Sequence, residues 1–242
     1  MCGIPYPKKQ KSGNRMLENK TITKIKIIYI ILVYLVWTVA QLVISPALHQ
    51  ITGNISFQIL FDGILKNLLW TVPALFLIRK FNEKLWIKSG ELFRNPFKLE
   101  TDQKKEMLWI ILLEIAFCVL NSVVSHKGFY FRADGLPECV SFLFVGITEE
   151  FVFRAWLLNS GIKDNNQKNR YFAIAVNAVL FLCIHFPIWI LQGNFITNFT
   201  NFGFVTILAL SVFFSWTMLY FRTIWIPVIV HMIWDILVTV LN

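Results

Sequence analysis

Seven apolar segments, each close to the length that crosses a bilayer, constrain the fold of this chain most. A helix needs about 20 residues to cross the hydrocarbon core. We expect spans at about residues 25–45, 57–78, 107–125, 139–160, 172–192, 202–220 and 224–241. A hydrophobic share of 56% and a charged share of 15% are too apolar for an ordinary soluble domain. The sequence therefore predicts an all-α, polytopic membrane protein with about seven (six to eight) transmembrane helices.

The basic residues predict the orientation of these spans. Of the 23 Lys and Arg residues, 19 fall in segments on one side, 2 (Lys127 and Arg132) in loops on the other, and Lys66 and Arg154 within spans. By the positive-inside rule this puts the N-terminus in the cytoplasm and the C-terminus outside. The net charge of +9 is then a topology signal with some attraction to anionic lipid, and we expect no nucleic-acid partner.

The chain divides into three parts by composition. Residues 1–20 form a basic cytoplasmic tail, residues 21–138 form N-terminal membrane helices, and residues 139–242 carry most of the candidate chemistry. A cytoplasmic loop at about 79–106 is expected to lie along the membrane surface, with Trp86 at headgroup level. We expect no cleavable signal peptide. The four scattered cysteines predict neither a disulfide framework nor a thiolate metal site.

Three ionisable residues, Glu149, Glu150 and Arg154, lie near the middle of an apolar stretch. An ionisable group at the bilayer centre costs about 2.5–3.5 kcal/mol on insertion scales, so such residues point to function. Glu150 and Arg154 are four apart and can pair on one helix face. Glu149 points about 100° away, with Phe153 as its nearest neighbour on that face. The spacing predicts a paired Glu150 and a Glu149 without a partner.

Two histidines and an aspartate lie in later spans. His185 follows Phe181 by four residues, and His231 and Asp235 are four apart on one face of the last helix. At a rise of 1.5 Å per residue, their depths in the membrane are close to that of Glu149. We therefore expect helices from three spans to meet at one polar site.

Other intramembrane groups have simpler interpretations. Asp62 and Lys66, four apart in the second span, are expected to form a helix-packing pair, and Glu114 in the third span has no assignable role. The Glu150–Arg154 pair could also serve only to lock helices together. Histidines in membranes can act as interhelical hydrogen bonders.

The candidate residues suit the hydrolysis of an amide bond. A free carboxylate and a histidine that face one cavity can deprotonate a water molecule. A second histidine can donate to the developing oxyanion. A nucleophilic Ser or Cys is not needed, and Cys183 lies on a different face from His185.

Taken together, Glu149-Glu150-x-x-x-Arg154, Phe181-x-x-x-His185 and His231-x-x-x-Asp235 resemble the three-motif signature of the CAAX protease and bacteriocin-processing (Abi) family. These are intramembrane glutamic endopeptidases, and the resemblance covers about residues 139–242. It implies a catalytic base at Glu149, assisted by His185, and an oxyanion site at His231 and Asp235. Glu150, Arg154 and Phe181 would support them.

The last motif departs from the prenyl-protein proteases of the family, which commonly carry Asn where this chain has Asp235. An ionised aspartate can only accept hydrogen bonds. Either Asp235 is protonated, or it orients His231 and leaves the donation to the imidazole; we favour the second.

Three alternatives remain open from sequence. A zinc peptidase could use Glu149, His185 and His231 as ligands, although no H-E-x-x-H motif is present. A non-catalytic immunity or scaffold protein, or a proton-coupled transporter, would also retain such residues. The leading hypothesis is a cofactor-free endopeptidase of a bacterial plasma membrane that acts on peptides or membrane proteins, including signalling or bacteriocin-type peptides. The sequence leaves the oligomeric state open.

Overall fold

The computed structural model describes residues 12–126 and 130–241, and this part of the chain is helical without a strand. Of the described residues, 85% are helical, which confirms the all-α class. The elements run in this order: α1 (Ser12–Val39), η1 (Ala40–Ile44), α2 (Ser45–Ile51), α3 (Asn54–Gln58), η2 (Ile59–Thr71), α4 (Val72–Lys80), η3 (Asn82–Lys84), α5 (Ser89–Leu92), η4 (Pro96–Lys98), α6 (Thr101–His126), η5 (Ala133–Glu138), α7 (Cys139–Glu150), η6 (Phe151–Leu158), α8 (Gln167–Cys183), α9 (Phe186–Leu191), α10 (Phe195–Thr200), α11 (Gly203–Phe221) and α12 (Trp225–Leu241). Of these, η1, η2 and η6 are π-helical, and η3, η4 and η5 are short 3-10 helices.

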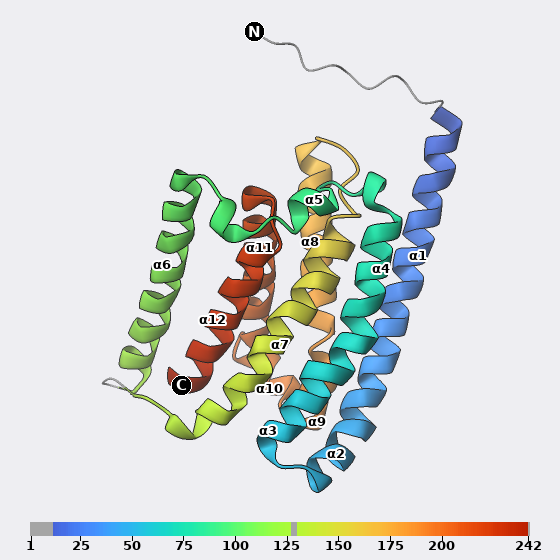
Figure 1. Cartoon of the computed structure of the whole chain (residues 1–242). Coiled ribbons are helices and arrows are strands. Elements are labelled where there is room, and N and C mark those ends of the chain that lie inside the picture. The colour runs from blue at the N-terminus through green and yellow to red at the C-terminus, as the bar shows by residue number, and fades with distance from the viewer. Residues whose placement is uncertain (1–11, 127–129, 242) are drawn as a thin grey trace.

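Five helical stretches in the described part are long and apolar enough to cross a membrane, which confirms a multi-pass membrane protein. They are Lys20–Ile51, Asn54–Lys80, Thr101–Val124, Gln167–Leu191 and Gly203–Phe221. The other two expected spans correspond to α7 with η6, which carries the three charged residues, and to the 17-residue α12. Both lie within the same bundle as the five (Figure 1).

The start of α1 and the end of α12 lie at opposite ends of the bundle (Figure 1). This arrangement is compatible with an odd number of crossings; the count of seven and the sides of the termini stay predictions. Of the expected basic tail, residues 1–11 lie outside the described residues, and helix α1 already begins at Ser12. Lys127, expected in an outer loop, also lies outside them.

One buried core draws on both the N-terminal and the C-terminal helices, and α12 packs against α6, α7 and α11. The approach of α7 to α12 is close at Gly146, where an added Cβ would lie 2.8 Å from Met232 Cγ. Large apolar side chains cover the outside of the bundle, as on Leu35, Phe76 and Leu113. In a soluble protein such surface would aggregate, whereas in a bilayer it faces lipid.

The loop after α4 packs onto one end of the helix bundle, and its expected place along the membrane surface stays a prediction. Ile87 and Leu92 are fully buried there. The side chain of Asn159 accepts from the Ile87 amide at 2.7 Å and donates to the Ile87 carbonyl at 2.9 Å. Trp86 is half-buried, and the guanidinium of Arg170 lies 5.2 Å from its ring centroid. The loop thus closes this end of the helix bundle.

The same loop holds the turn between α11 and α12. Arg222 adopts a left-handed conformation (φ 53°), and its guanidinium donates to both carboxylate oxygens of Glu91. The hydrogen bonds from Arg222 hold the pKa of Glu91 below its ordinary value. The Ile224 amide donates to the Leu92 carbonyl at 2.9 Å. These contacts fix the point at which the last helix begins.

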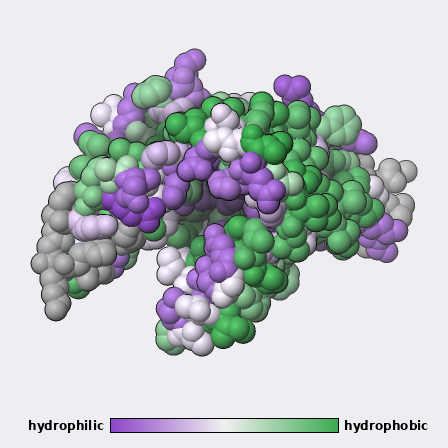
Figure 2. Space-filling view, turned by 90° about the horizontal axis from the view of Figure 1, so that it is seen from below, coloured by the Kyte–Doolittle hydropathy of each residue, from purple (hydrophilic) through white to green (hydrophobic). Residues whose placement is uncertain are grey.

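The opposite end of the bundle, which carries α2, α9 and α10, is hollowed. Figure 2 shows hydrophilic residues around this hollow and hydrophobic surface beside it. The protein therefore has a polar recess at one end and a loop-closed surface at the other.

Candidate active site

The two glutamates and the arginine lie where α7 continues as the π-helix η6. Glu150 and Arg154 are fully buried, and Arg154 Nη1 lies 3.1 Å from Glu150 Oε1, as their spacing predicted. Arg154 Nη2 also donates to Ser211 Oγ at 2.9 Å, and the guanidinium lies 4.2 Å from the ring centroid of Phe181. Arg154 therefore connects η6 to both α8 and α11. Short π-helical segments in proteins often occur at functional sites.

Glu149 is paired with a lysine from the N-terminal half, so the expectation of a partnerless carboxylate is wrong. Lys66 Nζ, on η2, donates to Glu149 Oε1 at 2.8 Å, and both side chains are buried. The Lys66 ammonium also lies 4.8 Å from the ring of Trp37 and 4.9 Å from that of Trp70. Two indole faces and one carboxylate thus stabilise a cation at this depth.

The expected pairing of Lys66 with Asp62 gives way to this contact. Asp62 instead accepts a hydrogen bond from the Ser141 hydroxyl on α7. The π-helical form of η2 is supported by Asn67, whose amide donates to the carbonyls of Asp62 at 3.1 Å and Gly63 at 3.0 Å. A π-helix has more residues per turn than an α-helix, so residues four apart on η2 no longer face each other closely. Asp62 and Lys66 therefore contact separate partners on α7.

His185 lies in the break between α8 and α9. Pro187, which follows at the start of α9, has no amide proton and cannot continue the hydrogen-bond ladder of α8. The His185 amide donates to the Leu182 carbonyl at 3.1 Å, and its ring Nδ1 lies 2.8 Å from the Phe181 carbonyl. Because a carbonyl only accepts, Nδ1 carries a proton. In the neutral ring, Nε2 is then the nitrogen with a free lone pair.

His231 on α12 is the centre of the cluster. Its Nδ1 lies 2.8 Å from Glu150 Oε1, its Nε2 lies 3.4 Å from Asp235 Oδ2 and 4.0 Å from Glu149 Oε2. The ring of Phe214 stacks on the imidazole with a centroid distance of 4.6 Å. Glu150 therefore orients His231 more directly than Asp235 does, although the spacing of the last motif predicts only the contact with Asp235.

Acidic and basic side chains alternate around His231. Glu149, Glu150 and Asp235 are acidic, and Lys66 and Arg154 are basic. His185 interacts electrostatically with Glu149 and with His231. The predicted site residues thus meet, although their catalytic roles stay predictions.

Three residues of this region were missed as members of the site. The sequence could have indicated Lys66 and Glu114 as site residues, because a charged residue within a membrane span points to function. Glu114 on α6 is buried, neither carboxylate oxygen has a hydrogen-bond partner, and it interacts electrostatically with His231 and Asp235. Nothing in the sequence singles out Ser211 on α11, because serines are common in apolar helices.

The described residues offer no group of three or more His, Cys, Asp or Glu side chains that could hold a metal ion. Glu149 is paired with Lys66, and Glu150 with Arg154 and His231. The zinc hypothesis keeps its own test, the effect of chelation on activity.

Comparison with known proteins supports the motif assignment. The family model described as "Type II CAAX prenyl endopeptidase Rce1-like" matches residues 138–237. The comparisons with curated proteins and with solved structures found no match. The matched segment contains Glu149, His185, His231 and Asp235 and agrees with the expected range of 139–242. Residues 138–237 are thus similar to the Rce1-like proteases, in agreement with the CAAX protease resemblance that the motifs indicated.

Proposed function

We propose that this protein is an intramembrane endopeptidase that hydrolyses peptide bonds with a water activated by Glu149 and His185. The Rce1-like match supports a protease of the CAAX type. The single observation that supports the mechanism is the convergence of Glu149 and Asp235 on His231. Glu149 Oε2 lies 4.0 Å and Asp235 Oδ2 lies 3.4 Å from His231 Nε2. Side chains from separate helices supply the base and the donor that hydrolysis needs.

In the proposed reaction the two oxygens of Glu149 have different tasks. Lys66 holds Oε1 at 2.8 Å, which leaves Oε2 to accept a proton from water. His185 Nε2 accepts a hydrogen bond from the same water and orients it. The water oxygen then attacks the carbonyl carbon, and the proton passes from Glu149 to the leaving nitrogen as the C–N bond breaks. Glu149 is ionised again at the end.

His231 stabilises the oxyanion in this proposal. Its Nδ1 faces Glu150 Oε1 at 2.8 Å, and an ionised carboxylate accepts, so Nδ1 donates. Nε2 can then donate to the oxyanion only when the ring is an imidazolium. Asp235, at 3.4 Å from Nε2, and Glu150 both favour that form of the ring. Asp235 thereby acts through His231 and does not itself contact the oxyanion.

The substrate class in this proposal is a peptide segment within or beside the bilayer. Full-length wild-type protein, Glu149→Gln and His185→Gln are compared in two assays: peptide profiles of the membranes that contain them, and cleavage of a reporter peptide with and without a farnesylated cysteine. We expect the rate to fall by about 10²–10⁴-fold in each variant. Asp62→Asn is the matched control, a half-buried carboxylate on the neighbouring element η2, and it should keep most of the activity.

Thermal unfolding of each variant separates lost chemistry from lost fold. If Glu149→Gln is folded and every product of the wild-type protein persists, the proteolytic function is wrong. Activity that survives strong chelation would exclude the zinc alternative.

The Lys66–Glu149 ion pair is the observation that favours a second function. A carboxylate held by a lysine at 2.8 Å is less available as a base, as expected for a non-catalytic immunity or scaffold protein. That function predicts that Glu149→Gln alters neither the membrane peptide profile nor the phenotype, provided that the variant is folded.

A further inference from the structure

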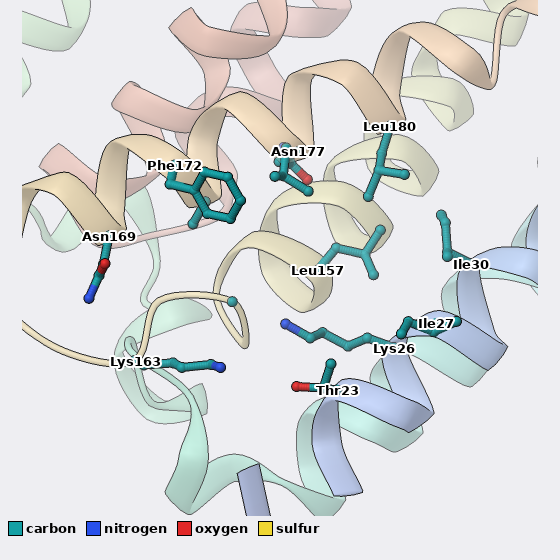
Figure 3. Close-up of a pocket in the computed structure, with 13 residues that line it drawn as sticks. Thr23, Lys26, Ile27, Ile30, Leu157, Lys163, Asn169, Phe172, Asn177 and Leu180 are labelled. Carbon is teal, nitrogen blue, oxygen red and sulfur yellow. The ribbon is translucent and has the colours of Figure 1, made fainter. Parts of the chain in front are cut away.

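A pocket separate from the polar cluster lies between α1, η6 and α8. Its volume is about 590 Å³, and its walls include Ile30 of α1, Leu157 of η6 and Leu180 of α8 (Figure 3). Pockets that hold small ligands measure about 300–1,000 Å³. The Tyr34 hydroxyl donates to the Leu180 carbonyl and fastens α1 to α8 at this point. Three helical elements therefore form the walls of the pocket, and a hydrogen bond joins two of them, α1 and α8.

Two lysines give the pocket a positive charge. The ammonium groups of Lys26 and Lys163 point into the same space (Figure 3) and repel each other. Of the 13 described residues that line the pocket, none is acidic. Lys26 Nζ donates only to a backbone carbonyl among the contacts described, that of Ser160 at 3.3 Å. An anion between these two ammonium groups would relieve their repulsion.

The carboxylate of the adjoining loop, that of Asp164, is hydrogen-bonded to Asn169, which lines the pocket, and to a backbone amide. Asp164 accepts from the Asn169 amide at 3.0 and 3.2 Å, and from the Asn166 backbone amide at 3.0 Å. These contacts direct it to the start of α8. The two lysines thus remain available to an external anion.

The rest of the pocket is apolar and opens on the flank of the bundle. Ile27 is 52% exposed, Phe172 71% and Val176 41%, and all three line the pocket. They belong to α1 and α8, within the stretches that can cross a membrane. Hydrocarbon chains of the surrounding lipid therefore have direct access to these side chains.

We propose that this pocket binds an anionic glycerophospholipid, with its phosphate between Lys26 and Lys163 and an acyl chain along Ile27, Phe172 and Val176. A free phosphate would leave the apolar wall unused. A lipid without net charge would neutralise the two lysines less well. The combination of charge and apolar surface is thus best matched by a phosphatidylglycerol-type lipid. This lipid site is independent of the proposed proteolysis.

The test measures lipid binding by the full-length protein in neutral phosphatidylcholine nanodiscs, as phosphatidylglycerol is added. Native mass spectrometry counts bound lipid, and thermal unfolding reports stabilisation. We expect Lys26→Gln/Lys163→Gln to weaken phosphatidylglycerol binding by at least about tenfold. The matched control is Lys20→Gln/Lys24→Gln, which removes the same charge from exposed positions of α1 outside the pocket and should change binding less than twofold.

Two further arms separate the sources of binding. Ala173→Phe fills the apolar part of the pocket without a change of charge and should also weaken binding. If Lys26→Gln fails to fold, Lys163→Gln alone carries the test, because Lys163 is exposed. Equal losses in both double variants, unchanged binding in Ala173→Phe, or equal stabilisation by inorganic phosphate would each overturn the proposal.

Discussion

Replacing Lys66 by methionine should destabilise the protein strongly. The substitution keeps an unbranched side chain, one heavy atom shorter, but removes the charge that faces Glu149. The two side chains are 4% and 8% exposed, and their charged atoms are 2.8 Å apart. Removal of one partner from a buried ion pair costs about 3–5 kcal/mol, because the other charge stays buried without compensation. We therefore expect Lys66→Met to lower the free energy of unfolding by this amount.

A double-mutant cycle tests the origin of that loss. Glu149→Gln should also destabilise, whereas Lys66→Met/Glu149→Gln should recover much of the sum of the single losses, since neither charge remains. The assay is equilibrium unfolding in mixed micelles, followed by helical circular dichroism. Lys104→Met, at an exposed position of α6, is the control and should be nearly neutral. A loss below about 1 kcal/mol in Lys66→Met, or strictly additive single losses, would refute the reasoning.

Three other sites give predictions of their own. Gly146→Ala should lower the free energy of unfolding by about 1–3 kcal/mol, because the added Cβ would lie 2.8 Å from Met232 Cγ and overpack the helix contact. Adding Met232→Ala should restore stability in the double variant. Unchanged stability in Gly146→Ala would contradict the close approach of the two helices. Asn159→Ala should lower the free energy of unfolding by about 1–3 kcal/mol, since the backbone amide and carbonyl of Ile87 lose their partners at 2.7 and 2.9 Å. Limited proteolysis should then cut the loop after α4 faster than in wild type. Equal cleavage rates would disprove this prediction. The pKa of Glu91 is lowered from 4.5 by Arg222, so the stability that this pair contributes is present above pH 4.5 and is lost as the pH falls below it. The difference in melting temperature between wild type and Glu91→Gln should shrink on acidification, and a difference that grows would have the wrong sign.

The fold class was predictable because its signal is compositional. Apolar stretches of about 20 residues need no tertiary information, and helices in lipid satisfy their own backbone. The expected spans therefore agree with helices, even where the expected boundaries miss the break at His185. The three π-helical segments were not predictable, because hydrophobic periodicity in a fully apolar stretch does not distinguish them from an α-helix.

The site was predictable in its members but not in its pairings. Spacing within one helix correctly gave Glu150 with Arg154, because residues four apart face each other whatever surrounds them. The same rule failed for Asp62 and Lys66, since contacts from α7 reach both side chains. A partner from a distant helix depends on packing angles, which no short-range pattern encodes. That is why the partner of Glu149 was missed.

The hydrogen bonds across residue 138 bear on how this chain can be divided. The family match begins at residue 138, yet Glu149 has its cation on η2, Asn159 holds the loop after α4, and the turn into α12 is fixed by Glu91. The boundary of the family is therefore not a boundary of folding. An excised 138–242 fragment would retain every family motif but lose the ammonium beside its proposed base and the cap over its bundle. The N-terminal half therefore supplies the site and the bundle end with contacts that none of the three family motifs contains.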